Sequence, residues 1–226
     1  MRFFVTGTDT GVGKTEVSAA LLSAMARAGL KPTAWKPAES GGTGDSRRLW
    51  DAAGRWQRRD EVSTWKLKRP LAPALAAKAE GQRISWAKVR ARFAELGDGP
   101  LVVEGAGGLF VPLAEGHDVI DLVVALKLPV VLVARAGLGT LNHTSLSLEA
   151  LARRRVKVAA VVLSRGSNAR DPSVPLNRPE LERRFPGVRF LGPVPFVRDA
   201  AKRARAFERV VDAGLVRPNL PGASRR

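Results

Sequence analysis

Short apolar runs alternate with amphipathic stretches along most of the chain. The apolar runs predict buried strands over residues 2–6, 32–36, 100–104, 129–134, 156–163 and 188–191. Between them, apolar side chains recur at helical spacing, which predicts helices over residues 14–28, 45–53, 85–96, 119–126, 141–154, 178–185 and 199–213. Strands that are apolar throughout are typical of parallel sheets. The pattern therefore predicts a doubly wound, mostly parallel α/β sheet with helices on both faces.

Several of these elements carry their own start or stop signals. Gly29 is a good stop for the helix at 14–28, and Ser85 is a good N-cap for the helix at 85–96. Residues 66–81 stay ambiguous, because two prolines precede an alanine-rich turn. No linker divides the 226 residues, so we predict a single domain over residues 1–218. Proline, glycine and arginine from Gly214 onward predict a loose end, with residues 219–226 as a tail.

The composition narrows the classes of function. The chain has no cysteine, which excludes disulfides, thiolate catalysis and zinc fingers and fits a reducing, cytoplasmic location. It opens directly on an apolar strand, so we expect no signal peptide. The most apolar stretch, residues 119–134, is interrupted by Asp121, Lys127 and Pro129, which argues against a membrane span.

The formal net charge of +17 would suit a polyanion such as nucleic acid. However, the basic residues are scattered in short groups such as Arg153–Arg155, and no base-stacking aromatic residues interleave with them. An arginine-rich sequence with some affinity for phosphorylated ligands explains the same charge. We therefore expect no nucleic-acid partner.

A glycine-rich segment joins the first predicted strand to the first helix, and it reads Gly7-Thr8-Asp9-Thr10-Gly11-Val12-Gly13-Lys14-Thr15. Its glycines let successive backbone N–H groups face a polyphosphate. Lys14 would neutralise the β- and γ-phosphates of a nucleotide, and the Thr15 hydroxyl would ligate Mg²⁺. The strict pattern has glycine at position 8, so this is a variant loop whose first glycine comes one residue early. It predicts a fold of the P-loop NTPase type, the alternative being a glycine-rich turn with an incidental lysine.

Two further segments follow predicted strands. Lys36 opens Lys36-Pro37-Ala38-Glu39-Ser40-Gly41, and we expect its strand to lie close to strand 2–6 in the sheet. A second cation beside the phosphate loop would stabilise charge during phosphoryl transfer; otherwise Lys36 is an exposed loop lysine. Glu104 ends a buried strand and is followed by Gly105-Ala106-Gly107-Gly108. This carboxylate could hold Mg²⁺, with Asp45 as a further ligand, or merely cap a turn.

The segment Gly137-Leu138-Gly139-Thr140-Leu141-Asn142-His143 leads into a predicted helix. The exposed N–H groups at such a helix start could receive a carboxylate, because they carry the positive end of the helix dipole. Simple helix capping is the alternative.

The segments at 7–15, 36–41, 104–108 and 137–143 together resemble the dethiobiotin synthetase family in their order and spacing. The resemblance covers nearly the whole chain and weakens after about Pro218. It implies an ATP-dependent cyclo-ligase of biotin biosynthesis that acts on 7,8-diaminopelargonate and CO₂. One amine takes up CO₂ as a carbamate, the γ-phosphate of ATP is transferred to that carbamate, and the other amine closes the cyclic urea. The products are dethiobiotin, ADP and phosphate.

The resemblance also implies roles for residues. Lys36 is the catalytic lysine, with Lys14 and Thr10 beside the reacting groups, and Thr15, Asp45 and Glu104 bind Mg²⁺. The residues expected to contact ATP are Thr10, Gly11, Val12, Gly13, Lys14, Thr15, Asp45, Glu104, Gly105, Ala106, Gly107, Ser164, Val194, Pro195 and Phe196. The substrate is expected to contact Ser40 and, across the interface of a homodimer, Gly139, Thr140, Leu141 and Asn142. The family usually has asparagine at the position of Ser164, and a serine hydroxyl cannot offer the donor and acceptor pair of an amide to adenine.

Two other classes share a variant phosphate loop. A DNA-partitioning-type P-loop ATPase would suit the positive charge, but those proteins carry a signature lysine early in the loop, where this chain has Asp9. Amidotransferase-type synthetases need a glutamine-hydrolysing domain with a cysteine nucleophile, and this chain has no cysteine. The ligase is therefore the favoured hypothesis.

Overall fold

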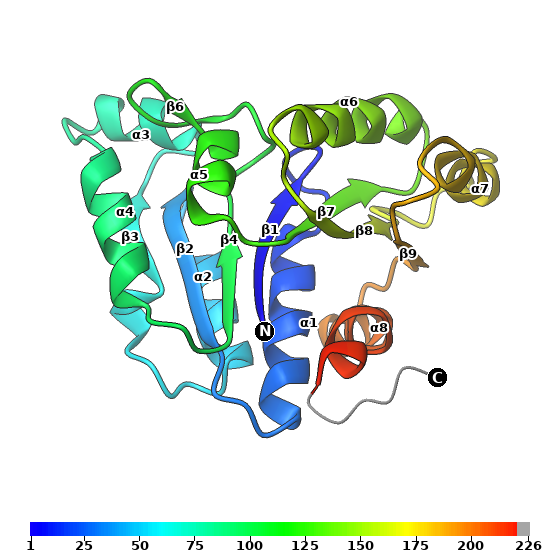
Figure 1. Cartoon of the computed structure of the whole chain (residues 1–226), viewed down its shortest axis with the longest axis horizontal. Coiled ribbons are helices and arrows are strands. Elements are labelled where there is room, and N and C mark those ends of the chain that lie inside the picture. The colour runs from blue at the N-terminus through cyan, green and yellow to red at the C-terminus, as the bar shows by residue number, and fades with distance from the viewer. Residues whose placement is uncertain (221–226) are drawn as a thin grey trace.

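The computed structural model describes residues 1–220 and contains one central parallel sheet (Figure 1). Its strand order is β3-β2-β4-β1-β7-β8-β9. The strands are β1 (Arg2–Gly7), β2 (Thr33–Ser40), β3 (Ser63–Leu67), β4 (Leu101–Glu104), β7 (Val130–Arg135), β8 (Val158–Ser164) and β9 (Phe190–Val194). A separate antiparallel pair is formed by β5 (Pro112–Ala114) and β6 (His117–Asp118). The predicted doubly wound, parallel α/β fold is confirmed.

Helices cover both faces of this sheet (Figure 1). One face packs against α1 (Lys14–Arg27), α2 (Gly44–Ala52) and α8 (Ala200–Val211). The other packs against α3 (Pro73–Ala79), α4 (Trp86–Glu95), α5 (Val119–Leu126), α6 (Thr140–Arg153) and α7 (Val174–Arg184). Alternation along β1 divides the core, because Phe4 belongs to the second layer while Phe3 and Val5 belong to the first. Ser85 caps α4 as expected, accepting a hydrogen bond from the backbone N–H of Lys88.

The sheet differs from the prediction at β2. This strand does not end at Lys36 but continues to Ser40, because Lys36 through Ser40 pair with β3. Its pairing with β4 reaches only Trp35, so Pro37, which has no N–H to donate, lies beyond that ladder. In addition, β4 lies between β1 and β2, so the two strands expected to be close are not neighbours.

The C-terminal region also differs from the prediction. After α8 the chain continues as a π-helix over Asp212–Val216 and a 3₁₀ turn over Arg217–Asn219. Leu215 and Val216 are buried against the α1 side of the core, so the loose end expected from Gly214 onward is wrong for these residues. The Asn219 side chain donates to the carbonyl of Leu215, and the rest of the expected tail, residues 221–226, lies outside the described residues. Within residues 1–220, no helix has the length and apolarity needed to cross a bilayer.

Candidate active site

The phosphate-binding loop connects β1 to α1 in the centre of the sheet. Gly11 and Gly13 have φ angles of 74° and 103°, in the region that favours glycine. A Cβ atom on Gly7 would approach the Val12 side chain to 2.8 Å and the Asp9 carbonyl to 2.9 Å. Close packing therefore requires glycine at position 7, which accounts for the early first glycine of the variant loop. The Lys14 ammonium donates to the Asp9 carbonyl oxygen at 2.8 Å.

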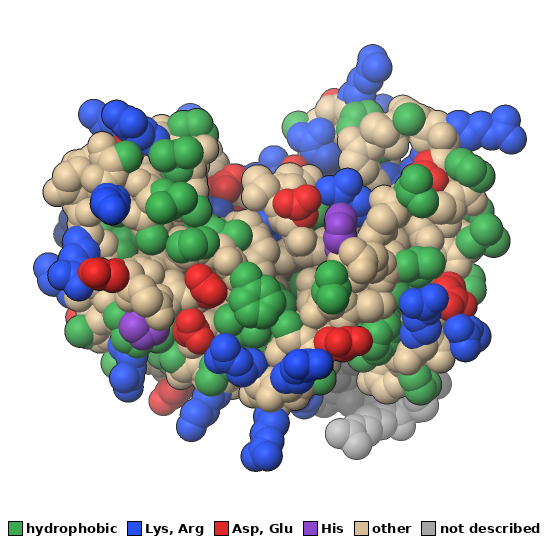
Figure 2. Space-filling view, turned by 90° about the horizontal axis from the view of Figure 1, so that it is seen from above, with side chains coloured by type: hydrophobic (Ala, Val, Ile, Leu, Met, Phe, Trp, Pro, Cys, Tyr) green, Lys and Arg blue, Asp and Glu red, His purple; other side chains and the backbone are tan. Residues whose placement is uncertain are grey.

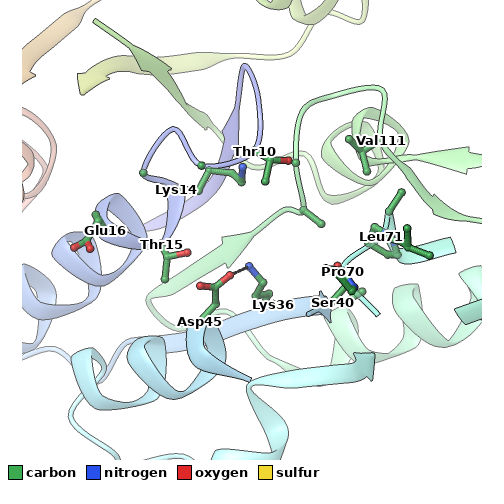
Figure 3. A pocket seen from close by; sticks show the side chains of 17 residues that line it. Thr10, Lys14, Thr15, Glu16, Lys36, Ser40, Asp45, Pro70, Leu71 and Val111 are labelled. Atoms are coloured by element: carbon green, nitrogen blue, oxygen red, sulfur yellow. Dashed lines mark hydrogen bonds and ion pairs between the residues drawn. The ribbon is translucent and has the colours of Figure 1, made fainter. Parts of the chain in front are cut away.

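Beside this loop, a buried lysine is held by two carboxylates. The Lys36 Nζ lies 2.7 Å from Asp45 Oδ2 (Figure 3) and 2.5 Å from Glu104 Oε1. Burial alone would lower the pKa of Lys36, but the charges of Glu104 and Asp45 outweigh burial and raise it above its usual value. Lys36 is 4% exposed, so the alternative of an exposed loop lysine is wrong.

Glu104 also joins this lysine to the phosphate loop. The Thr15 hydroxyl donates to Glu104 Oε1 at 3.0 Å, while Glu104 Oε2 is buried without a hydrogen-bond partner among the described residues. Burial would raise the pKa of Asp45, but the attraction of Lys36 and its hydrogen bond lower it. Side chains of β4, α1 and α2 thus meet around Lys36 and Thr15, and among residues 1–220 one buried carboxylate oxygen of this cluster has no hydrogen-bond partner.

A cavity of about 600 Å³ opens over this cluster (Figure 3). It brings together many residues predicted from the sequence: Thr10, Gly11, Gly13, Lys14, Thr15, Lys36, Ser40, Asp45, Ala106 and Gly107. Pro70, Leu71 and Val111 supply the apolar part of its wall, which was not predicted from the sequence. The signal for Pro70 and Leu71 lay in the ambiguous segment 66–81. A cavity with cations on one side and apolar side chains on another can bind a ligand that is anionic at one end and hydrocarbon-like elsewhere.

The residues expected to read the nucleotide base lie on the other flank of the loop. Ser164 ends β8, pairs in register with Val194 of β9, and places its hydroxyl beside Gly13. Pro195 and Phe196 follow directly. None of these four residues lines the 600 Å³ cavity, but Ser164 lines a smaller hollow of about 270 Å³ with Thr10 and Gly11.

The segment Gly139–Asn142 lies at the start of α6, also outside the main cavity. Gly139 has φ 91°, and no side chain caps the helix. The Thr140 hydroxyl is buried and pairs with that of Thr144 at 3.1 Å, so what this helix start offers a ligand is mainly its backbone N–H groups. Leu138 just before it is 80% exposed.

The fold and the loop define a P-loop nucleotide-binding protein. A family model described as "AAA domain" matches residues 1–204. Among solved structures, a nucleotide-binding protein in complex with ADP from Archaeoglobus fulgidus superposes with a TM-score of 0.53 at 16% identity, covering 92% of this chain and 86% of that one. At that identity the likeness shows the fold alone.

Similarity to curated proteins is much higher. An ATP-dependent dethiobiotin synthetase from Anaeromyxobacter dehalogenans is 48% identical over 94% of this chain and 97% of its own length. The corresponding protein of Bacillus licheniformis is 36% identical over 88% and 87%. The chain belongs to the dethiobiotin synthetase family.

Proposed function

We propose that this chain carboxylates 7,8-diaminopelargonate and closes it to dethiobiotin at the expense of ATP. One amine adds to CO₂ and loses a proton, which gives a carbamate. A carbamate oxygen attacks the γ-phosphorus of ATP, and ADP departs with the electrons of the broken P–O bond. The second amine then attacks the carbonyl carbon of the mixed anhydride and loses a proton, and phosphate leaves with the electrons of the broken C–O bond. The observation that carries this proposal is a buried Lys36 that faces the same cavity as Lys14.

The two lysines have different tasks in this reaction. Carbamate and triphosphate are both anionic, so their approach requires concentrated positive charge in a site that excludes water. Lys14 belongs to the loop that wraps the phosphates and meets the β- and γ-phosphates. Lys36 comes from a different strand and faces the carbamate and the phosphoryl group in transfer. Thr10 lines the same cavity, and Ser40 at the end of β2 contacts the diamine.

The residues around Glu104 fit a magnesium ion. Their donors are carboxylate and hydroxyl oxygens, which Mg²⁺ prefers, and Glu104 Oε2 has no other partner among the described residues. Thr15, Asp45 and Glu104 would hold the ion, and when bound it would neutralise charge on the β- and γ-phosphates.

A homodimer completes the proposed site. The start of α6 lies outside the main cavity. Two apolar side chains near it are exposed: Leu138, which lies just before the helix, and Leu146 within the helix, which is 59% exposed. Hydrophobic side chains lie scattered over the face seen in Figure 2. Burial of Leu138 and Leu146 against a second copy of the chain would bring the N–H groups of Gly139–Asn142 to the partner's cavity. There they would receive the substrate's carboxylate. Light scattering of the purified protein would test the dimer. We also propose that the enzyme works in the cytoplasm.

The decisive experiment measures ADP release with diaminopelargonate and bicarbonate, each omitted in turn, and identifies dethiobiotin by mass spectrometry. We expect turnover to require both substrates. Turnover that does not depend on the diamine and is stimulated by DNA would refute the proposed ligase activity and favour the partitioning-type ATPase.

A further inference from the structure

A glutamate held by two arginines lies directly after the phosphate loop. Glu16 Oε1 accepts from Arg203 Nε at 3.0 Å, and Glu16 Oε2 contacts the Arg48 guanidinium. The three residues come from α1, α8 and α2, and all three side chains are at most one third exposed. Glu16 is the acidic residue in the first turn of α1, where a carboxylate interacts favourably with the helix dipole.

Arg203 has a second set of partners. Its Nη1 donates to the carbonyl oxygens of Val197 at 3.2 Å and Arg198 at 3.4 Å. These residues belong to the connection between β9 and α8, which has no regular secondary structure at Pro195–Val197. In the described part of the chain, no other hydrogen bond reaches the backbone of residues 195–198. The bridge from Glu16 through Arg203 therefore links the backbone of this connection to the start of α1.

The same connection begins where the nucleotide base is expected. Lys36, Asp45 and Glu104 occupy one flank of the phosphate loop, and the γ-phosphate must point toward them for transfer. The base then extends toward the opposite flank, where β8 and β9 end side by side at Ser164 and Val194. Pro195 and Phe196 are the next residues after β9, and Phe196 directly precedes Val197, one of the two residues whose carbonyls Arg203 binds.

We propose that Glu16 and Arg203 are positioning residues that hold the connection at 195–198 in place for the nucleotide base. This inference rests on the proposed function, because it assumes that ATP binds across this loop. A planar guanidinium can donate to the carboxylate from Nε and to the two carbonyls from Nη1 at the same time, whereas the compact ammonium of lysine cannot span both. The bridge therefore acts on the recognition of the base through the connection at 195–198, whereas Lys14 and the loop amides contact the phosphates.

The test compares Arg203→Lys and Glu16→Gln with the wild type in two assays. The first measures kcat/KM for ATP and for CTP. The second measures inhibition by inorganic tripolyphosphate, which occupies the phosphate loop but has no base. Loss of a charge-assisted hydrogen bond should raise the KM for ATP about tenfold and lower the preference for ATP over CTP. The inhibition constant for tripolyphosphate and the kcat at saturating ATP should change by less than about twofold.

Glu180 provides a matched control, because it also accepts from two arginines, Arg183 and Arg184, but on the outer surface of α7. Glu180→Gln and Arg184→Lys should change neither assay. An unchanged ATP to CTP preference in both bridge variants would overturn the inference, and so would a parallel loss of tripolyphosphate binding, which indicates general distortion of the loop. Failure of the proposed function is distinguishable, because the wild type itself would then show no turnover that depends on the diamine.

Discussion

Replacing Lys14 by methionine should stabilise the protein while it abolishes turnover. Lys14 is 8% exposed, and burial lowers its pKa to about 8 although Glu104, Asp45 and Asp9 act in the opposite direction. Lys36 lowers it further. Because the folded-state pKa lies below the unfolded value, the unfolded chain binds more protons between the two values. The stability of the wild type therefore rises as the pH increases from about 8 to about 10.5, and below that range the buried charge destabilises the fold.

The size of the effect follows from the interval between the two pKa values. At 1.36 kcal/mol per pH unit, holding this proton below pH 8 costs roughly 3 kcal/mol of folding free energy. Methionine is similar in length and apolar, so it removes this cost. It also removes the hydrogen bond to the Asp9 carbonyl, which is worth about 1 kcal/mol. The expected net gain near neutral pH is therefore about 2 kcal/mol.

Urea unfolding without nucleotide checks this prediction at about pH 6.5 and about pH 10. The gain should be present at the lower pH and largely disappear at the higher pH, where the wild-type lysine is neutral. Lys157→Met, at an exposed position, is the control and should show no such dependence. A variant that is less stable than the wild type at pH 6.5, or a gain that is equal at both pH values, would refute the reasoning. Turnover should be lost because the cation that meets the phosphates is gone.

Three further predictions concern the neighbouring residues. Lys36→Met should lower kcat by about two decades, the scale of one lost transition-state donor, while calorimetry without the diamine should show ATP binding almost unchanged; weaker binding at unchanged kcat would make Lys36 a nucleotide ligand only. Glu104→Gln should require much more Mg²⁺ for half-maximal rate, and an unchanged requirement would mean that Glu104 only supports the turn. Ser164→Asn should increase the kcat/KM ratio of ATP over CTP, because an amide can both donate to and accept from adenine; a constant ratio would show that the base is read elsewhere.

The sequence predicted an element well where the residues that determine it are adjacent in the chain. The phosphate loop, the stop near Gly29 and the Ser85 cap depend on adjacent residues, and the structure has them. By contrast, β3 was hidden because its sequence, Ser63-Thr64-Trp65-Lys66-Leu67, mixes polar and apolar residues, as suits a strand at the edge of the sheet. The strand order was also not contained in any local pattern, since β4 inserts between β1 and β2 from far along the chain.

The same distinction applies to the candidate site. The sequence indicated Lys36, Asp45 and Glu104 separately, but their ion pairs depend on β2, α2 and β4 meeting at one edge. The bridge from Glu16 to Arg203 was not predicted, because its partners are 187 residues apart and neither belongs to a motif. Leu215 and Val216 were placed in a loose end because glycine and proline surround them, whereas α8 folds them back onto the core. Each of these features depends on contacts between residues far apart in the sequence, which local patterns do not contain.

The central position of β1 has a consequence for synthesis on the ribosome. This strand is synthesised before both of its neighbours in the sheet, which are β4 at 101–104 and β7 at 130–135. At a synthesis rate of about 5–20 residues per second, Phe3, Phe4 and Val5 remain unpaired for several seconds or longer before either partner strand has been made. During that time the nascent chain exposes an unpaired hydrophobic segment that could associate with other chains. Expression should therefore depend more strongly on chaperones that bind nascent chains than the stability of the finished enzyme would suggest.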